Sequence, residues 1–96
     1  MKYDLEERPL QFAKDIRTFV TMLPRTIASE QDVRQLMGAS GSVGADSIEA
    51  NESLSKKDFV MRIKISRKEA KESRYWLQLL DTGEKDSVGK ACDALI

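Results

Sequence analysis

Large apolar residues recur along this chain at steps of three and four, which is the spacing of one face of an α-helix. The first such stripe consists of Phe12, Ile16, Phe19, Val20 and Leu23. Pro9 suits the start of this helix, and Pro24 ends it, because the residue before a proline is pushed out of the α region. The pattern therefore predicts a first helix over residues 9–23.

A second helix is predicted over residues 30–51, opened by Ser29 and Asp32 as a capping pair. Its middle reads GASGSVGADSIEA, which is as rich in Gly, Ala and Ser as a flexible joint, yet the helical periodicity continues through it. Interior glycines cost roughly 1 kcal/mol each relative to alanine in a helix. We therefore favour a helix whose small residues let a neighbouring helix approach closely, over the alternative of a flexible joint. The residues expected at this close contact are Gly41, Gly44 and Ala45.

The third and fourth helices are predicted over residues 56–81 and 87–96. Ser55 and Asp58 form a second capping pair, and Gly83 is a good terminator of the third helix. The core stripe of that helix alternates steps of four and three, which is heptad spacing and favours nearly aligned helices. This stripe consists of Phe59, Ile63, Ser66, Ala70, Ser73, Leu77 and Leu80. The fourth helix is too short to be stable alone, so we expect it to pack against a partner subunit or to be shorter than in related chains.

Length and composition narrow the class of protein. A chain of 96 residues forms one domain, over residues 1–96, with a modest core, so oligomerisation is expected. The absence of histidine removes the commonest general base and metal ligand, and a single cysteine allows no intrachain disulfide. No catalytic residue, metal site or cofactor is predicted, and Cys92 is expected to be a buried, inert thiol. The N-terminal residues resemble neither a signal peptide nor a membrane span, which favours a soluble cytoplasmic protein.

Charge is balanced overall, with 16 basic and 16 acidic side chains, but it is unevenly distributed. Residues 53–80 carry eight basic and three acidic side chains. One side of the third helix holds a basic row that consists of Lys64, Arg67, Lys68, Lys71 and Arg74. On one interpretation this basic row is a solvated face, stabilised by pairs such as Lys68 with Glu72. On the other it contacts nucleic-acid phosphates, and its binding depends strongly on salt.

The segment GSVGADSIEANESLSKKDFVMRIKISRKEAKESRYWLQLL, residues 41–80, closely resembles the four-helix-bundle proteins of the 23S ribosomal RNA intervening-sequence family. These are found as reading frames inside insertions in bacterial ribosomal RNA genes. The earlier LEERPLQFAKDIRTFVTMLP resembles the first helix of that family. A more distant resemblance is to the accessory protein of diversity-generating retroelements, a basic pentamer that binds nucleic acid. The resemblance implies an all-α, up-and-down (antiparallel) four-helix bundle that assembles as a homopentamer and has no established catalytic activity.

The resemblance also bears on individual positions. Relatives tend to have Asn followed by a large apolar residue where this chain has Asp46 and Ser47, and they tend to carry a longer final helix. Glu49 and Glu72 align with acidic positions that recur in the family. Because bundle metal sites normally pair glutamate with histidine, we expect structural roles for both carboxylates, near basic groups such as Arg67 or at a helix end.

Together these observations favour a non-enzymatic, oligomeric helical-bundle protein that acts as an RNA-associated adaptor. The alternative is an oligomeric scaffold that binds a protein partner and has no nucleic-acid role. The expected partners are further copies of the chain, as a pentamer, together with RNA or DNA, or a protein; a membrane is not expected. Tyr75 and Trp76 are interpreted as core or subunit-interface residues rather than as base-stacking residues.

Overall fold

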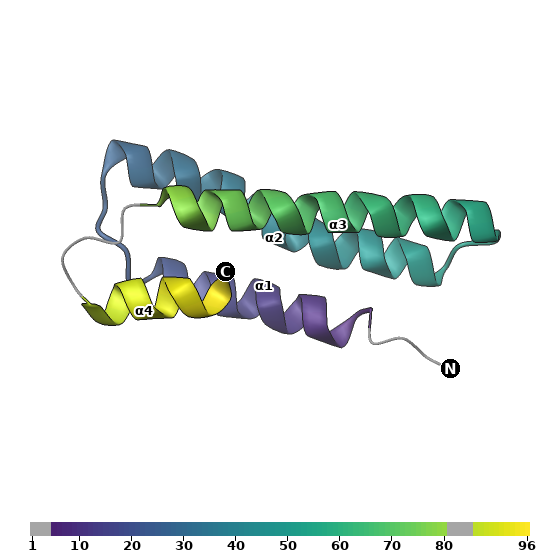
Figure 1. Cartoon of the computed structure of the whole chain (residues 1–96), viewed down its shortest axis with the longest axis horizontal. Helices are drawn as coiled ribbons and strands as arrows, with labels where there is room; N and C mark the ends of the chain where they lie inside the picture. Colours follow the sequence, from purple (N-terminus) through teal and green to yellow (C-terminus); the bar gives the residue numbers. More distant parts are fainter. Residues whose placement is uncertain (1–4, 81–85) are drawn as a thin grey trace.

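The computed structural model describes residues 5–80 and 86–96. Four helices occupy these ranges, and no strand occurs within them: α1 (Glu7–Val20), α2 (Ile27–Asn51), α3 (Lys56–Leu79) and α4 (Asp86–Leu95). Figure 1 shows that consecutive helices run in opposite directions along an elongated molecule of 48 × 23 × 15 Å. The predicted fold class, an all-α up-and-down bundle with a short fourth helix, is confirmed.

The bounds of α1 differ from the prediction, which placed Pro9 at the first helical position and the end of the helix just before Pro24. The helix begins at Glu7, so Pro9 is its third residue rather than its first. A proline fits there because the first four backbone N–H groups of a helix have no partner within it. The helix ends at Val20, and two further backbone hydrogen bonds, from Met22 and Leu23, continue the turn toward Pro24.

The start of α2 corrects the predicted capping pair. Thr26, not Ser29, is the N-cap: its hydroxyl accepts the Ser29 N–H at 3.0 Å, and the Ser29 hydroxyl accepts the Thr26 N–H at 2.9 Å. This reciprocal arrangement is a capping box that uses two hydroxyls. It starts the helix at Ile27, because Thr26 already has an extended backbone and leaves Ser29 inside the first turn.

The helix α3 begins as the sequence indicated. Ser55 is its N-cap and accepts the Asp58 N–H at 3.1 Å. The helix ends at Leu79, with Leu80 as an extended C-cap residue. The predicted terminator, Gly83, lies outside the described residues.

The helices α2 and α3 pack against each other along most of their lengths, and small hydroxyl side chains fill much of this contact. The buried polar residues of these two helices are all serines: Ser29, Ser40, Ser47, Ser66 and Ser73. Ser47 and Ser66 meet across the interface, with their hydroxyl oxygens 3.1 Å apart. Both hydroxyls also donate to the carbonyl of Val43, at 2.7 and 3.0 Å. Because every one of these polar groups has a partner, burying them carries little desolvation penalty.

Larger apolar side chains gather at the end of the bundle where α4 lies. The buried cluster there consists of Ile16, Phe19, Leu36, Leu77, Leu80 and Cys92. Phe12, Met37 and Trp76 pack against it from the sides. This cluster draws on all four helices and is the main apolar core of the described chain.

The short helix α4 covers only part of the bundle. It packs on α1 and α3, which make no close backbone approach to each other in the described ranges. Ten helical residues extend about 15 Å, whereas the 24 residues of α3 extend about 36 Å. The helix α3 is therefore about 21 Å longer than α4, which packs beside only part of it.

Candidate nucleic-acid interface

All five members of the basic row are exposed in the structure. Lys68 lies 3.9 Å from Glu72 on the next turn, which is the pair that the sequence predicted. The other four, Lys64, Arg67, Lys71 and Arg74, form no ion pair with any described carboxylate. Four cations without carboxylate partners are therefore available for phosphate or carboxylate groups of a partner.

Three members of the basic row border a groove of about 530 Å³ between α1 and α3. Arg67, Lys71 and Arg74 line it from α3, and Arg8 lines it from α1. The sequence analysis did not single out Arg8. Its spacing could have indicated it, because Arg8 precedes Phe12 by four residues and so shares the helix face that borders the groove.

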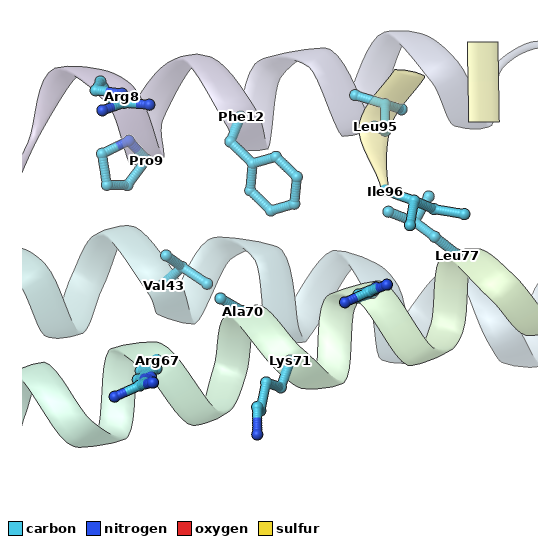
Figure 2. Close-up of a pocket in the computed structure, with 11 residues that line it drawn as sticks. Arg8, Pro9, Phe12, Val43, Arg67, Ala70, Lys71, Leu77, Leu95 and Ile96 are labelled. Atoms are coloured by element: carbon cyan, nitrogen blue, oxygen red, sulfur yellow. The ribbon is translucent and has the colours of Figure 1, made fainter. Parts of the chain in front are cut away.

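The floor of this groove is apolar. Pro9 and Phe12 of α1, Val43 of α2 and Ala70 of α3 form it, and Leu77, Leu95 and Ile96 close one end. Figure 2 shows Pro9 and Phe12 projecting from α1 toward Val43 and Ala70, with Lys71 directed outward from α3. Ala70 belongs to the predicted core stripe of α3 but is exposed. It lines the groove instead.

The two glutamates with predicted structural roles make ion pairs on the surface. Glu49 pairs with Arg62 at 2.7 Å rather than with Arg67, and Arg62 also lies 3.8 Å from Asp58. Glu72 pairs with Lys68. Exposed pairs of this kind contribute little to stability, about 0–1 kcal/mol each.

The carboxylate of Glu69 has a pKa above its ordinary value. Partial burial raises the pKa of Glu69, and the nearby carboxylate of Glu72 raises it further. Asp46, across on α2, adds to the shift, while Lys68 opposes it. Asp46, Glu69 and Glu72 thus lie near one another on the α2–α3 surface, with Lys68 beside them.

The small residues of α2 do not pack as predicted within one chain. A Cβ added at Gly38 or Gly41 would have no heavy atom of another element within 4 Å. Only Gly44 faces a neighbour, where a Cβ would lie 3.6 Å from Pro9 Cβ of α1, and Ala45 is exposed. The close contact between α2 and α3 is made by the buried serines instead, because they lie on the side of α2 that faces α3.

The aromatic pair and the thiol occupy the positions expected of them. Trp76 packs against the apolar core while Tyr75 is exposed, and their rings meet edge to face with centroids 5.1 Å apart. Cys92 is buried in that core and donates to the Leu77 carbonyl at 3.2 Å. Burial raises the pKa of the Cys92 thiol, with a contribution from Asp93, so the unreactive protonated form is favoured.

Two features of the described residues bear on other functions. No group of three or more His, Cys, Asp and Glu side chains is placed to hold a metal ion there. Among the helices of those ranges, none combines the length and apolar character that crossing a bilayer requires.

The fold and the surface together define a small all-α bundle with a cation-lined groove. The family model of the 23S rRNA-intervening sequence protein matches residues 2–85, and the chain belongs to this family. The comparison with curated proteins found no match, and neither did the comparison with solved structures. The resemblance inferred from the sequence is thus confirmed at the level of the family.

Proposed function

We propose that this protein is a non-enzymatic, RNA-binding bundle that acts as a homo-oligomer in the cytoplasm, with the basic row of α3 as its phosphate-contacting surface. The observation that carries the proposal is the row itself, in which four exposed cations lie on one helix face without carboxylate partners among the described residues. An exposed cationic row along a helix can contact phosphates, which supply most of the affinity in non-specific nucleic-acid binding.

Assembly strengthens the proposal. In a symmetric ring, such as the homopentamer implied by the family resemblance, each subunit repeats the row, so a local charge becomes a continuous positive band. Each added phosphate contact releases counterions and steepens the dependence of affinity on salt. This accounts for RNA binding by a chain whose overall net charge is zero.

The experiment that tests RNA binding is a salt titration with a structured ribosomal RNA fragment. Affinity is measured from about 50 to 200 mM salt for the wild type and for a triple variant, Lys64→Glu, Arg67→Glu and Lys71→Glu. The expected result is weaker binding and a flatter slope of log K against log salt. Retained affinity and slope in the folded triple variant contradict the proposal.

A matched control separates the effect of where the reversed charges lie from the effect of the change in net charge. Lys14, Lys56 and Lys57 are also exposed, and none of them belongs to the basic row or lines the groove. Reversing these three charges changes the net charge by the same amount. The proposal expects this control to bind RNA much more tightly than the triple variant, because short-range phosphate contacts outweigh net charge under salt screening.

The second candidate function is an oligomeric scaffold for a protein partner, with no RNA role. It is favoured by large apolar side chains exposed at the end of the bundle away from α4: Ile48, Leu54, Val60 and Met61.

The test of assembly uses Gly41→Leu. Because Gly41 has open space around it in one chain, loss of mass by light scattering would report a contact between subunits rather than a misfolded bundle. An unchanged mass argues against assembly through this face of α2.

A further inference from the structure

A second stripe with heptad spacing runs along the side of α3 that faces away from the core. Each of its members follows a member of the core stripe by two residues, which is about 200° around an α-helix. This outer stripe consists of Met61, Ile65, Lys68, Glu72, Tyr75 and Leu79. None of the six is buried, and Met61, Tyr75 and Leu79 are 48, 56 and 51% exposed. Alternating steps of four and three on an exposed face are typical of a helix that packs against another helix.

The charges at the centre of the outer stripe are complementary to a second copy of the same stripe. Lys68 and Glu72 lie on successive turns, with Nζ and Oε1 3.9 Å apart, and both side chains remain accessible to a partner. A second α3 that runs antiparallel places Lys68 opposite Glu72 of the partner subunit, and the two-fold symmetry repeats this pair. A parallel arrangement would place Lys68 against Lys68 of the partner subunit, and such like-charge contacts cost free energy.

The same antiparallel register also matches the apolar ends of the outer stripe. Met61 and Leu79 lie seven residues outside the central pair of charges, one on each side. Ile65 and Tyr75 lie three residues outside it in the same way. An antiparallel pair therefore brings Met61 to Leu79 of the partner subunit, and Ile65 to Tyr75 of the partner subunit. One register thus satisfies the charged centre and both apolar ends.

We propose that the outer stripe of α3 is an interface between two copies of this chain, whose α3 helices pack antiparallel about a two-fold axis at the centre of the stripe. Burial of the apolar ends stabilises the pair. The central charges fix the direction and register, because a polar position within an apolar heptad stripe is satisfied in only one alignment. A two-fold contact closes at two copies, so it differs from the head-to-tail contact that builds a ring. The inference goes beyond the proposed RNA binding and does not depend on it.

Like charges beside the outer stripe limit the strength of this contact. Lys71 precedes Glu72 by one residue and Glu69 follows Lys68 by one, so they flank the stripe on opposite sides near the two-fold axis. Each therefore approaches its own counterpart in the second copy. Because both positions lie at the edge of the contact, water and salt screen this repulsion. We expect a dissociation constant between about 1 µM and 1 mM, as for contacts below the standard interface size.

The test uses two charge reversals that weaken the contact singly and restore it when mixed. Lys68→Glu leaves only acidic side chains at the centre and Glu72→Lys leaves only basic ones, so each should pair about tenfold more weakly than the wild type or worse. An equimolar mixture restores opposite charges across the interface, although each chain still carries like charges within itself. The readout is the light-scattering mass from about 1 µM to 1 mM protein. The wild type and the mixture should reach at least about twice the mass of either variant alone.

A matched pair of reversals is the control. Lys14→Glu and Glu30→Lys make the same charge changes at exposed positions of α1 and α2, and each should keep the mass of the wild type. A mixture of Lys68→Glu and Glu72→Lys that is no heavier than either variant overturns the proposal. The absence of two-fold association in the wild type up to about 1 mM also overturns it.

A pair of uncharged substitutions tests the apolar ends. Met61→Gln removes apolar area from the outer stripe, whereas Leu10→Gln makes a similar change at a residue of α1 that is 54% exposed. Both positions are exposed, so both variants should fold. Met61→Gln should weaken the association about tenfold, and Leu10→Gln should leave it unchanged. Equal behaviour of the two variants overturns the assignment of the interface to α3.

Titration of the wild type with RNA keeps the two proposals apart. The mass measurements are made without RNA, so they report the α3 contact alone. A wild type that associates through α3 but does not bind RNA contradicts the proposed function only. A wild type that binds RNA with a steep salt dependence, while Lys68→Glu and Glu72→Lys remain unassociated on mixing, contradicts the α3 interface only.

Discussion

The two ends of this bundle are packed by different side chains. At the end that contains α4, the core is made of large apolar residues such as Ile16, Phe19 and Leu36 from several helices. Toward the α2–α3 turn, the contact between these two helices depends on Ser47 and Ser66, which share the Val43 carbonyl. One end is stabilised mainly by hydrophobic burial, and the other by close backbone packing with satisfied hydroxyls.

The comparison explains why the groove opens where it does. Leucine-sized side chains require partners on several sides, and α4 supplies one of those sides with Leu95 and Cys92. Serines complete their contacts within the α2–α3 pair and do not require a fourth helix. The middle of the molecule, around Ala70, lies between the apolar core and the serine contact. Ala70 is exposed there and lines the groove.

The largest expected effect is a loss of stability at the α4 end. Leu36→Ala removes a fully buried side chain and leaves a cavity, which should lower the free energy of unfolding by about 2–5 kcal/mol. Ser47→Ala should lower it by only about 1 kcal/mol, because it removes hydrogen bonds but little volume. Urea denaturation at one fixed protein concentration measures both, since assembly makes stability depend on concentration. Equal losses would mean that the two ends are not stabilised differently.

Enlarging a side chain at the serine contact should also destabilise the protein, because α2 and α3 approach each other closely there. Ser66→Leu places a larger side chain against α2 where the Ser47 hydroxyl lies 3.1 Å away. Overpacking of this kind typically lowers stability by about 1–3 kcal/mol. Thermal unfolding monitored by circular dichroism provides the measurement. A variant as stable as the wild type would show that α2 and α3 can separate at this point without loss.

Substitution of the unpacked glycines should stabilise the protein. Gly38→Ala and Gly41→Ala add a methyl group that meets nothing within the chain and removes the helical penalty of glycine, so each should raise stability by about 1 kcal/mol. Ala45→Gly, at an exposed position of the same helix, is the control and should lower stability by a similar amount. If Gly41→Ala destabilises instead, that face of α2 is in contact with another subunit.

The smallest expected effect depends on pH. Because the pKa of Glu69 is raised in the folded protein, its ionised form disfavours folding. That penalty is absent well below the ordinary pKa of 4.5 and complete once the pH exceeds the raised value. Glu69→Gln should therefore be slightly more stable than the wild type near neutral pH and equal to it in acid. Urea midpoints across that pH range provide the check, and a difference that grows toward acid contradicts the assignment.

Much of the fold could be predicted from periodicity, because three-four spacing depends on local backbone geometry alone. It identified the four helices and the helical character of the glycine-rich stretch, which is confirmed within α2. The first residue of α2 was placed wrongly because Thr26 and Ser29 are both good capping residues, and only the backbone conformation decides between them.

The candidate site was less predictable, because it depends on which helices meet. Spacing placed the basic row on one face of α3 but could not place Arg8 opposite it, since that requires the relative positions of α1 and α3. It also assigned Ala70 to the core, because a stripe does not show which of its positions another helix covers. Glu49 was expected near a basic group of the third helix such as Arg67, and it pairs with one, Arg62; which arginine it reaches depends on the register between α2 and α3.

The buried thiol of Cys92 gives the bundle an internal reporter. It is the only cysteine in the chain, and it lies on the buried face of α4 with its hydrogen bond to the Leu77 carbonyl. A thiol reagent can reach it only when α4 separates from α1 and α3, so the labelling rate measures how often the helix opens. The shortest of the four described helices therefore carries its own probe, and its opening can be followed without introducing any new residue.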